Sequence, residues 1–455
     1  MGKDVTEGRS PPRQLLPDPV GPDPQEPTSR RGIANKARAD KHHRVRDRYR
    51  CLNAHLLRVC WEDLTKAAAS GVDHIPAEEY AVNLQANIEA LAQRLKTKRY
   101  RAKLVRRWYM PKANGKERPL GIPAREDQLV QLACAKLLTA IYEQDFLDCR
   151  YGYRPGRGAL DAVRDLTCDL QYGRYGYLVE ADIQGFFAHM DHAWLLDMLR
   201  VRIDDRAFLT LIRTWLKAGV LADDGQVIHP ETGTPQGGTI SPVLANVYLH
   251  YALDLWFDKV VKAHCRGEAL LCRYADDWVC AFRYQDDAER FYRVLPQRLK
   301  KFSLQVAPEK THLRRFRRFH PGMKRHFTFL GFEFTWMPDR HGVSRVMRRT
   351  ARKKLQAACQ RLTAWIKEFR HLPERDVFQR LNARLRGHYN YYGVRGNSRS
   401  LTRFFRRAMD CAYKWLNRRG GKRSSYTWEQ FTRVLDRVKI ARPCITEVKR
   451  RRVFA

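Results

Sequence analysis

The sequence predicts an α+β core followed by an α-helical domain. Segments with helical periodicity and short apolar strands are mixed along most of the chain without strict alternation, which favours the α+β class. Beyond residue 345 the pattern becomes helical and basic. With 455 residues, 44% of them apolar and 11% aromatic, the chain can bury a sizeable core, so disorder of the whole chain is excluded.

The charge indicates the class of partner. The chain has 86 Lys and Arg against 49 Asp and Glu, a net charge of +37, and residues 341–455 alone hold 31 against 7. A compact body this basic repels itself unless a polyanion neutralises it, and phosphate contacts release condensed counterions. We therefore expect a nucleic-acid partner. The alternatives are a solubilising basic surface or a patch for anionic lipid.

The sequence also indicates a compartment. No stretch approaches the roughly 18 uncharged apolar residues of a membrane span, and the N-terminus lacks the apolar region of a signal peptide. Eleven scattered cysteines without a CxxC pair fit reduced thiols rather than a zinc module or a disulfide framework. We expect a cytoplasmic, nucleoid-associated protein with no membrane partner.

The elements follow in order. Seven prolines within residues 1–30 predict a disordered leader, and Asn114-Gly115 predicts a hairpin within 105–123. Apolar runs predict a strand over 177–182, a strand pair at 270–282 and another at 328–336. Helical periodicity predicts helices near 45–61, 78–98, 125–143, 159–172, 194–203, 207–220, 241–257, 289–302, 348–370, 375–387 and 401–418.

Three acidic residues carry the candidate chemistry. Asp276 and Asp277 lie at the tip of the strand pair, and Asp182 ends another apolar strand. If these strands are neighbours in one sheet, the carboxylates meet at one edge and repel each other unless a cation lies between them. Carboxylate oxygens suit Mg²⁺, and two such ions about 3.5–4 Å apart can activate a 3′-hydroxyl and stabilise a leaving pyrophosphate. The alternative is a solvated Asp-Asp tip.

The order of the neighbouring motifs favours the metal site. GTPQGG before the helix at Ser241 lets backbone approach a sugar or base closely. RPLGIP and nearby lysines offer cations for a triphosphate. Phe186-Phe187 could press on a nucleotide sugar and exclude a 2′-hydroxyl. Each motif alone is a weak indication, whereas their joint order along one chain is a strong one.

These motifs resemble the reverse transcriptase/maturase proteins encoded by bacterial group II introns. The resemblance covers about residues 50–445 and is most specific in GTPQGGTISPVLANVYLHYALDLWF, RYADDWVCAF and LRGHYNYYGVRGNSRSL. It implies a right-hand polymerase followed by a helical thumb and maturase domain. The implied divisions are a disordered Pro-rich basic leader (1–44), fingers with an N-terminal extension (45–175), a palm (176–340), a thumb or maturase X domain (341–420) and a basic nucleic-acid-binding tail (421–455).

The resemblance also implies site residues. Asp182, Asp276 and Asp277 would be the catalytic carboxylates and, with the Ile183 carbonyl, the ligands of two Mg²⁺ ions. The implied substrate-binding residues are Lys112, Arg118, Phe187 as ribose gate, Gln236 and Lys310. The implied RNA-binding residues are Arg386, Tyr389, Tyr391, Tyr392 and Arg395. Aromatic rings stack on unpaired bases while arginines neutralise phosphates, but we assign Phe404 and Trp415 to the helical core.

The implied function is an RNA-directed DNA polymerase that binds structured intron RNA, assists its splicing and copies it into cDNA during intron mobility. Its partners would be the intron RNA as template and ribozyme, a DNA target and primer, dNTPs, and, as an option the sequence leaves open, a second copy in a homodimer. With only Cys411 and Cys444 in the last 96 residues, we expect no HNH endonuclease. Two alternatives stay open: a non-enzymatic RNA-binding splicing factor, and a domesticated reverse transcriptase serving defence or a CRISPR locus.

Overall fold

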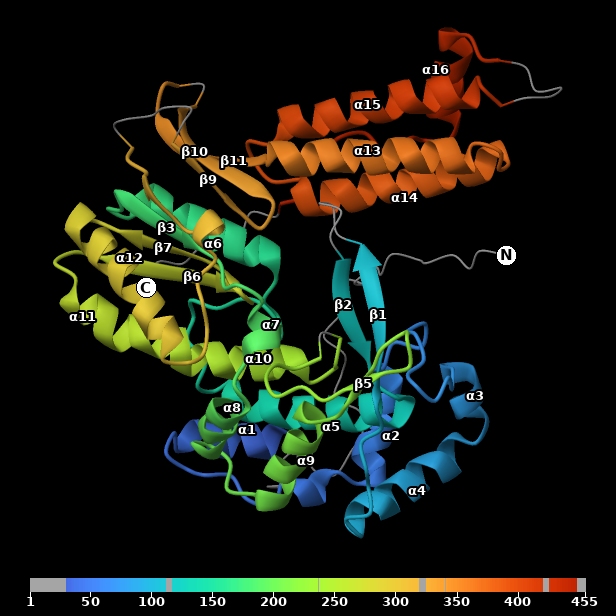
Figure 1. Ribbon diagram of the computed structural model, residues 1–455. Coiled ribbons are helices and arrows are strands. Elements are labelled where there is room, and N and C mark those ends of the chain that lie inside the picture. Colours follow the sequence, from blue (N-terminus) through green and yellow to red (C-terminus); the bar gives the residue numbers. More distant parts are fainter. Residues whose placement is uncertain are drawn as a thin grey trace.

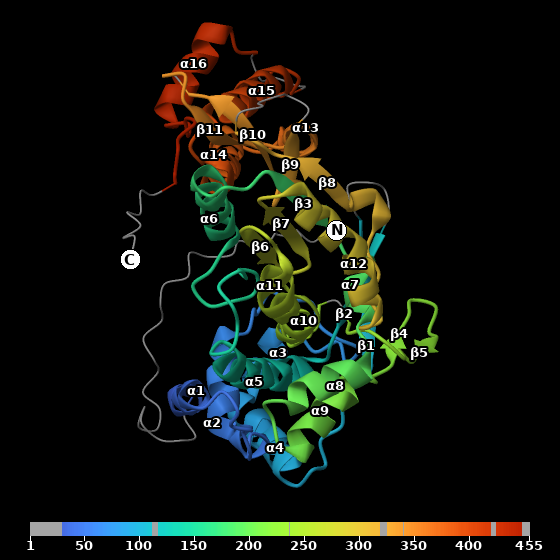
Figure 2. The same cartoon turned by 90° about the vertical axis from the view of Figure 1, so that its left-hand side faces the viewer.

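The computed structural model describes residues 30–111, 117–235, 237–318, 325–339, 341–419 and 425–447. Figures 1 and 2 show an N-terminal lobe of helices at one end of the molecule and long helices at the other, with a sheet between them. We call these parts the N-terminal lobe (30–142), the helical domain (351–447) and the central region (143–318). No helix in the described segments is both long and apolar enough to cross a bilayer.

The helix α5 (Arg125–Tyr142) is the axis of the N-terminal lobe, and most of its side chains are buried. The surrounding elements are α1 (Arg30–Ala39), η1 (Tyr49–Cys51), α2 (Ala54–Asp63), α3 (Ala77–Val82) and α4 (Leu84–Lys96). Ile33 and Ala37, four residues apart, give α1 a buried apolar face that packs on α5. The prediction of a disordered leader is therefore wrong for residues 30–44.

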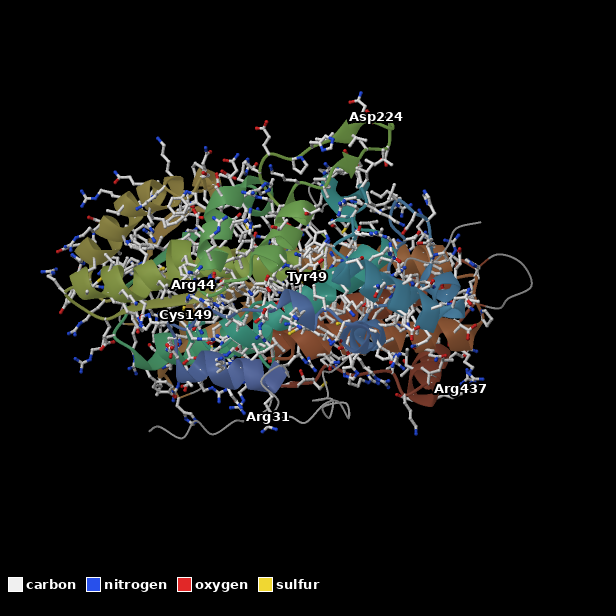
Figure 3. The ribbon with its side chains drawn as sticks, turned by 90° about the horizontal axis from the view of Figure 1, so that it is seen from below. Arg31, Arg44, Tyr49, Cys149, Asp224 and Arg437 are labelled. Carbon is white, nitrogen blue, oxygen red and sulfur yellow. The ribbon has the colours of Figure 1, made fainter. Side chains whose placement is uncertain are left out.

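A β-ribbon rises from this lobe towards the helical domain (Figure 1). Its strands, β1 (Val105–Pro111) and β2 (Glu117–Ile122), pair antiparallel with Pro111 opposite Glu117, which confirms the predicted hairpin; the Asn114-Gly115 turn lies outside the described residues. The short strands β4 (Val220–Leu221) and β5 (Val227–Ile228) extend the same sheet in the order β2-β1-β4-β5. Figure 3 shows Asp224 at the outer tip of β4–β5, away from the body.

The central sheet has the strand order β6-β7-β3-β8, and its strands pair antiparallel. Their bounds are β3 (Tyr177–Ala181), β6 (Ala269–Tyr274), β7 (Asp277–Phe282) and β8 (His312–Arg315). Along β7, Trp278, Cys280 and Phe282 join the core under α12, whereas Val279 and Ala281 join the core under α6. Both faces are thus buried, which explains why the sequence shows continuous apolar runs rather than polar alternation.

Helices cover the central sheet and link it to the N-terminal lobe. They are α6 (Ala159–Tyr172), α7 (Phe186–His189), α8 (His192–Arg200), α9 (Arg206–Leu216), α10 (Ser241–Leu249), α11 (Lys262–His264) and α12 (Gln285–Lys300). The helix predicted from Ser241 begins there, with Pro242 in its first turn. After Leu249 it widens into π-helical turns, η2 (His250–Asp254) and η3 (Phe257–Val261).

A connecting sheet joins the central region to the helical domain. Its strands are β9 (His326–Phe329), β10 (Phe332–Pro338) and β11 (Ser344–Thr350), in the order β11-β10-β9. The helices that follow are α13 (Arg352–Phe369), α14 (Glu374–Tyr392), α15 (Ser398–Leu416) and α16 (Trp428–Arg437). Because α16 buries Phe431, Val434 and Leu435 in the core of this domain, this part of the predicted basic tail (421–455) packs with the helical domain, and its binding of nucleic acid stays a prediction.

Candidate active site

The three predicted carboxylates lie at one edge of the central sheet. In the antiparallel pairing of β3 with β7, Ala181 is opposite Trp278, so Asp182, which follows Ala181, lies beside Asp277, which precedes Trp278. Asp276 lies in the two-residue turn between β6 and β7, where Tyr274 pairs with Asp277. The structure therefore brings together residues that lie almost 100 positions apart in the chain.

The carboxylates at this edge repel each other. Burial, and after it the charges of Asp182 and Asp276, raise the pKa of Asp277 to about 7. Burial and the charge of Asp182 also raise the pKa of Asp276, while Arg118 lowers it. Excess negative charge in a partly desolvated place is relieved by a cation, so the electrostatics fit a cation-binding edge.

Lys310 supplies a cation to this edge. It ends the short turn η4 (Pro308–Lys310), and its ammonium forms an ion pair with the Asp182 carboxylate. That hydrogen bond raises the pKa of Lys310. As the side chains lie, no three Asp, Glu, His or Cys residues of the described segments surround one point as a ready metal site. The ammonium of Lys310 is therefore the positive charge that faces the Asp182 carboxylate in this structure.

The backbone after Asp182 continues into a β-bridge with the segment before Pro308. Ile183 is opposite Val306 in an isolated antiparallel bridge. The hydrogen bonds of that bridge are made by the flanking residues, from Gln184 N to Gln305 O and from Ala307 N to Asp182 O, each at 2.9 Å. The Ile183 carbonyl therefore lies outside this ladder, and its role as a metal ligand stays a prediction.

The predicted substrate residues have different outcomes. Arg118 lies on β2 opposite Met110, close enough for its charge to lower the pKa of both Asp276 and Tyr153. Phe187 lies on α7 and is only 9% exposed, with its ring edge-to-face with Phe186 at 5.3 Å, so its role as a ribose gate stays a prediction. Lys112 and Gln236 lie outside the described residues.

The glycine-rich turn packs against the β-ribbon. Gly237 has a φ of +114°, and a Cβ there would lie 2.7 Å from the Gly121 carbonyl oxygen of β2. The close approach that this turn makes in the structure is to the backbone of the RPLGIP segment, and the predicted approach to a sugar or base stays a prediction. The turn is tied to the start of α10, because Thr234 and Ser241 share a hydrogen bond of 2.8 Å.

Sequence reasoning missed a buried ion pair behind the Ala275-Asp276 turn between β6 and β7, which we call the catalytic turn. Arg273 and Asp254 are both fully buried, and Arg273 Nε donates to Asp254 Oδ1 at 2.7 Å. Arg273 Nη1 also donates to the carbonyl oxygen of Ala275 at 2.8 Å, a turn residue with a φ of +57°. Gly152 packs so closely that a Cβ would lie 2.4 Å from Ala275 N. An arginine inside an apolar strand was the available indication.

Sequence reasoning also missed Tyr153. Its side chain is 50% exposed, and its φ is +57°. Partial burial and the charge of Asp276 raise the pKa of its phenol, while Arg118 lowers it. The phenol is therefore near enough to Asp276 and Arg118 for both charges to affect its pKa.

The RNA-binding residues predicted in the helical domain need a correction. Tyr389 is 1% exposed, and its hydroxyl donates to Ala441 O at 3.2 Å, so the prediction that its ring stacks on RNA is wrong. The rings of Tyr391 and Tyr392 pack on Phe332 of β10 instead of standing free. The physical reason is that α14 runs on to Tyr392 and carries these rings into its own core and the connecting sheet. Arg386 and Arg395 are exposed and stay candidates.

Trp415 is another aromatic residue of the helical domain, and it is partly exposed. Phe404 is in the core, as predicted. Trp415 packs against that core but keeps part of its surface exposed. Four cations lie around its ring, Lys367, Arg370, Lys414 and Arg418, at 5.3 to 5.9 Å from its centre. We call Trp415 and these four residues the Trp415 cluster.

A polymerase-type site for phosphoryl transfer needs carboxylates with cations beside them, and this sheet edge has that composition. A family model described as reverse transcriptase (RNA-dependent DNA polymerase) matches residues 110–334. The chain is 32% identical over 333 residues to Protein YkfC of Escherichia coli, which covers 66% of this chain and 84% of that protein. The protein therefore belongs to the group II intron reverse transcriptase/maturase family.

Other matches cover shorter segments of the chain. Group II intron-encoded protein LtrA of Lactococcus lactis is 42% identical over 164 residues, 36% of this chain and 27% of LtrA. Putative COX1/OXI3 intron 2 protein of Saccharomyces cerevisiae is 28% identical over 162 residues, 36% of this chain and 19% of that protein. The chain thus matches about a quarter of LtrA but most of YkfC.

Proposed function

We propose that the protein is an RNA-directed DNA polymerase that binds structured intron RNA, assists its splicing and copies it into cDNA. The observation that carries the proposal is the pairing of Ala181 with Trp278, because it supports one shared site for Asp182, Asp276 and Asp277. In this proposal the N-terminal lobe with its β-ribbon corresponds to the fingers, the central region to the palm and the helical domain to the thumb.

The residues would divide the work as follows. Asp182, Asp276, Asp277 and the Ile183 carbonyl would hold two Mg²⁺ ions, which when bound activate the primer 3′-hydroxyl and stabilise the leaving pyrophosphate. Lys310 would leave Asp182 as the metal binds, and its ammonium would stay beside the reacting phosphates. Arg118, with Lys112, would orient the triphosphate by charge-assisted hydrogen bonds. Phe187 and Gln236 would contact the nucleotide sugar or base.

The assistance of splicing needs no further chemistry from the protein. Binding energy alone can stabilise the folded state of an RNA, since a ligand that prefers one state shifts the population towards it. The basic helices and the Trp415 cluster, whose cations lie within 6 Å of one ring, support contact with phosphates and unpaired bases.

Primer extension tests the proposal. We expect the full-length protein to extend oligo(dT) on poly(A) with dTTP and Mg²⁺, and to lose the activity on chelation of the metal. The D276N variant removes one carboxylate charge with little change in shape, and we expect it to fall to the background of a reaction without protein. A native protein that binds folded RNA tightly but gives no Mg²⁺-dependent extension would instead be the non-enzymatic splicing factor.

A further inference from the structure

The turn between β9 and β10 lies between the helical domain and the catalytic edge. Leu330 and Gly331 form it, with φ values of +49° and +80°, and Phe329 pairs with Phe332 across it. Two successive left-handed residues make the tight hairpin turn that suits the twist of the strands. A leucine rarely adopts this conformation, so neighbouring groups must hold it.

The helical domain holds this turn through two tyrosines near the end of α14. The Tyr391 hydroxyl donates to Leu330 O at 2.9 Å, and its ring stacks on Phe332 with 5.7 Å between centres and 25° between planes. The Tyr392 ring lies 5.2 Å from the same Phe332 ring. Its hydroxyl oxygen lies 3.0 Å from the point where a Cβ on Gly331 would be. The turn is therefore clamped by hydroxyl and ring contacts together.

The other side of the turn faces the catalytic edge. β9 and β7 are in contact. The backbone amide of Leu330 is near enough to the Asp277 carboxyl to lower the pKa of that carboxyl, although burial raises this pKa by more. The charge of Asp277 is in turn among the influences that raise the pKa of Tyr391, after burial. One residue, Leu330, thus contacts a tyrosine of the helical domain through its carbonyl and faces a carboxylate of the active site through its amide.

We propose that Tyr391 is a positioning residue for catalysis, which orients the Asp277 carboxylate through the Leu330-Gly331 turn. The orientation of this carboxylate then depends on the position of the helical domain. The inference rests on the proposed polymerase function. It gives this part of HYNYYGVRGN a role in catalysis, in place of the predicted contact with RNA. Because the hydroxyl and the turn are neutral, Tyr391 acts only by fixing where the amide of Leu330 points.

The same helix supplies a matched control. Tyr389 precedes Tyr391 by two residues and also donates its hydroxyl to a backbone carbonyl, that of Ala441 at 3.2 Å. Ala441 belongs to the helical domain itself, away from the turn. Y389F and Y391F therefore each remove one hydroxyl and one hydrogen bond of the same kind while keeping the ring, and only Y391F releases the turn.

The experiment compares the native full-length protein, Y391F and Y389F. We would measure single-nucleotide addition to oligo(dT) on poly(A) at saturating dTTP across a Mg²⁺ titration, affinity for the same template–primer, and the melting temperature. Y391F should lower the rate constant of addition about three- to tenfold, the equivalent of one net hydrogen bond, and raise the Mg²⁺ concentration at half-maximal rate. Its template–primer affinity should be unchanged. Y389F should match the native rate while melting at a similar temperature to Y391F.

The outcomes separate the competing explanations. Equal rates for the native protein and Y391F, or equal losses in both variants, would overturn the positioning role. Weaker template–primer binding by Y391F with a native rate constant would restore the RNA contact predicted from the sequence. A native protein without Mg²⁺-dependent extension would overturn the proposed polymerase function and this inference with it.

Discussion

The central sheet and the helical domain differ in where they place their polar and aromatic side chains. At the sheet edge, charged side chains are half-buried and stay close to like charges, because the turns after β3 and β6 hold them there. In the helical domain, the tyrosines of α14 turn inward and most of the cations face outward. Polar side chains at the ends of strands thus stay partly exposed, whereas the tyrosines at the end of the long helix α14 are partly or fully buried by packing. The location of a residue in its element decides which of its properties is used.

The largest expected effect tests whether the sheet edge depends on its buried ion pair. R273M leaves the Asp254 carboxylate buried without this partner, so we expect a loss of about 3–5 kcal/mol in the free energy of unfolding. R273M/D254L removes one charge of each sign. The buried guanidinium of Arg150, whose charge interacts with both residues, then keeps the same net charge around it, so most of the stability should return. In both variants the Ala275 carbonyl lacks the hydrogen bond from Arg273, so we expect primer extension to be low in both. Urea unfolding and primer extension measure the two effects.

Full recovery of both stability and extension in R273M/D254L would contradict this prediction. The ion pair would then only support the fold, and the catalytic turn would hold its shape without the Arg273 hydrogen bond.

Two glycines sharpen the comparison between the regions. A Cβ on Gly152 would meet the backbone nitrogen of Ala275 at 2.4 Å, which no side-chain rotation can relieve. We expect G152A to lower stability by about 1–3 kcal/mol and to reduce extension by displacing the turn. On α14, a Cβ on Gly387 would meet nothing within 4 Å, so G387A should gain up to about 1 kcal/mol with native extension. A G152A protein with the native rate and melting temperature would show that the turn can shift freely.

Local motifs predicted most of the elements and the catalytic edge. RYADD between apolar runs and VEAD at a strand end gave both the strands and the carboxylates, because turn chemistry and alternation are short-range. Arg273 with Asp254, and Leu330 with Tyr391, could not be predicted, since each pair is brought together by tertiary packing. The prediction that Tyr389 binds RNA was wrong for the same reason, because a sequence pattern of aromatic residues and arginines does not distinguish a ring on the surface from one in the core.

A smaller effect is expected on the outward side of the helical domain. W415L removes the ring between Lys367, Arg370, Lys414 and Arg418, and loss of one stacked base should weaken binding of single-stranded RNA by about 1–3 kcal/mol. K414Q should instead reduce the slope of log K against log salt by about 0.7. R266Q, which changes an exposed arginine of the central region paired with Asp286, is the control. Filter binding at several salt concentrations would measure all three, and equal affinities would remove the Trp415 cluster from the RNA-binding surface.

The smallest effect concerns the joint between the connecting sheet and the end of the described chain. Glu447 accepts two hydrogen bonds from Arg348, at 2.7 and 2.9 Å, and one from Arg395 N at 2.9 Å. Although burial opposes it, these bonds hold the pKa of Glu447 below its usual value. A carboxyl with a lowered pKa in the folded state contributes stability above its unfolded pKa of about 4.3 and loses it as the pH falls through the folded value. E447Q should therefore be less stable than the native protein by about 1 kcal/mol at pH 7, and the difference should shrink below about pH 4. Thermal melts of both proteins across this pH range measure the difference, and a gap that stays constant down to pH 3 would mean that the ionised carboxylate contributes nothing to the joint.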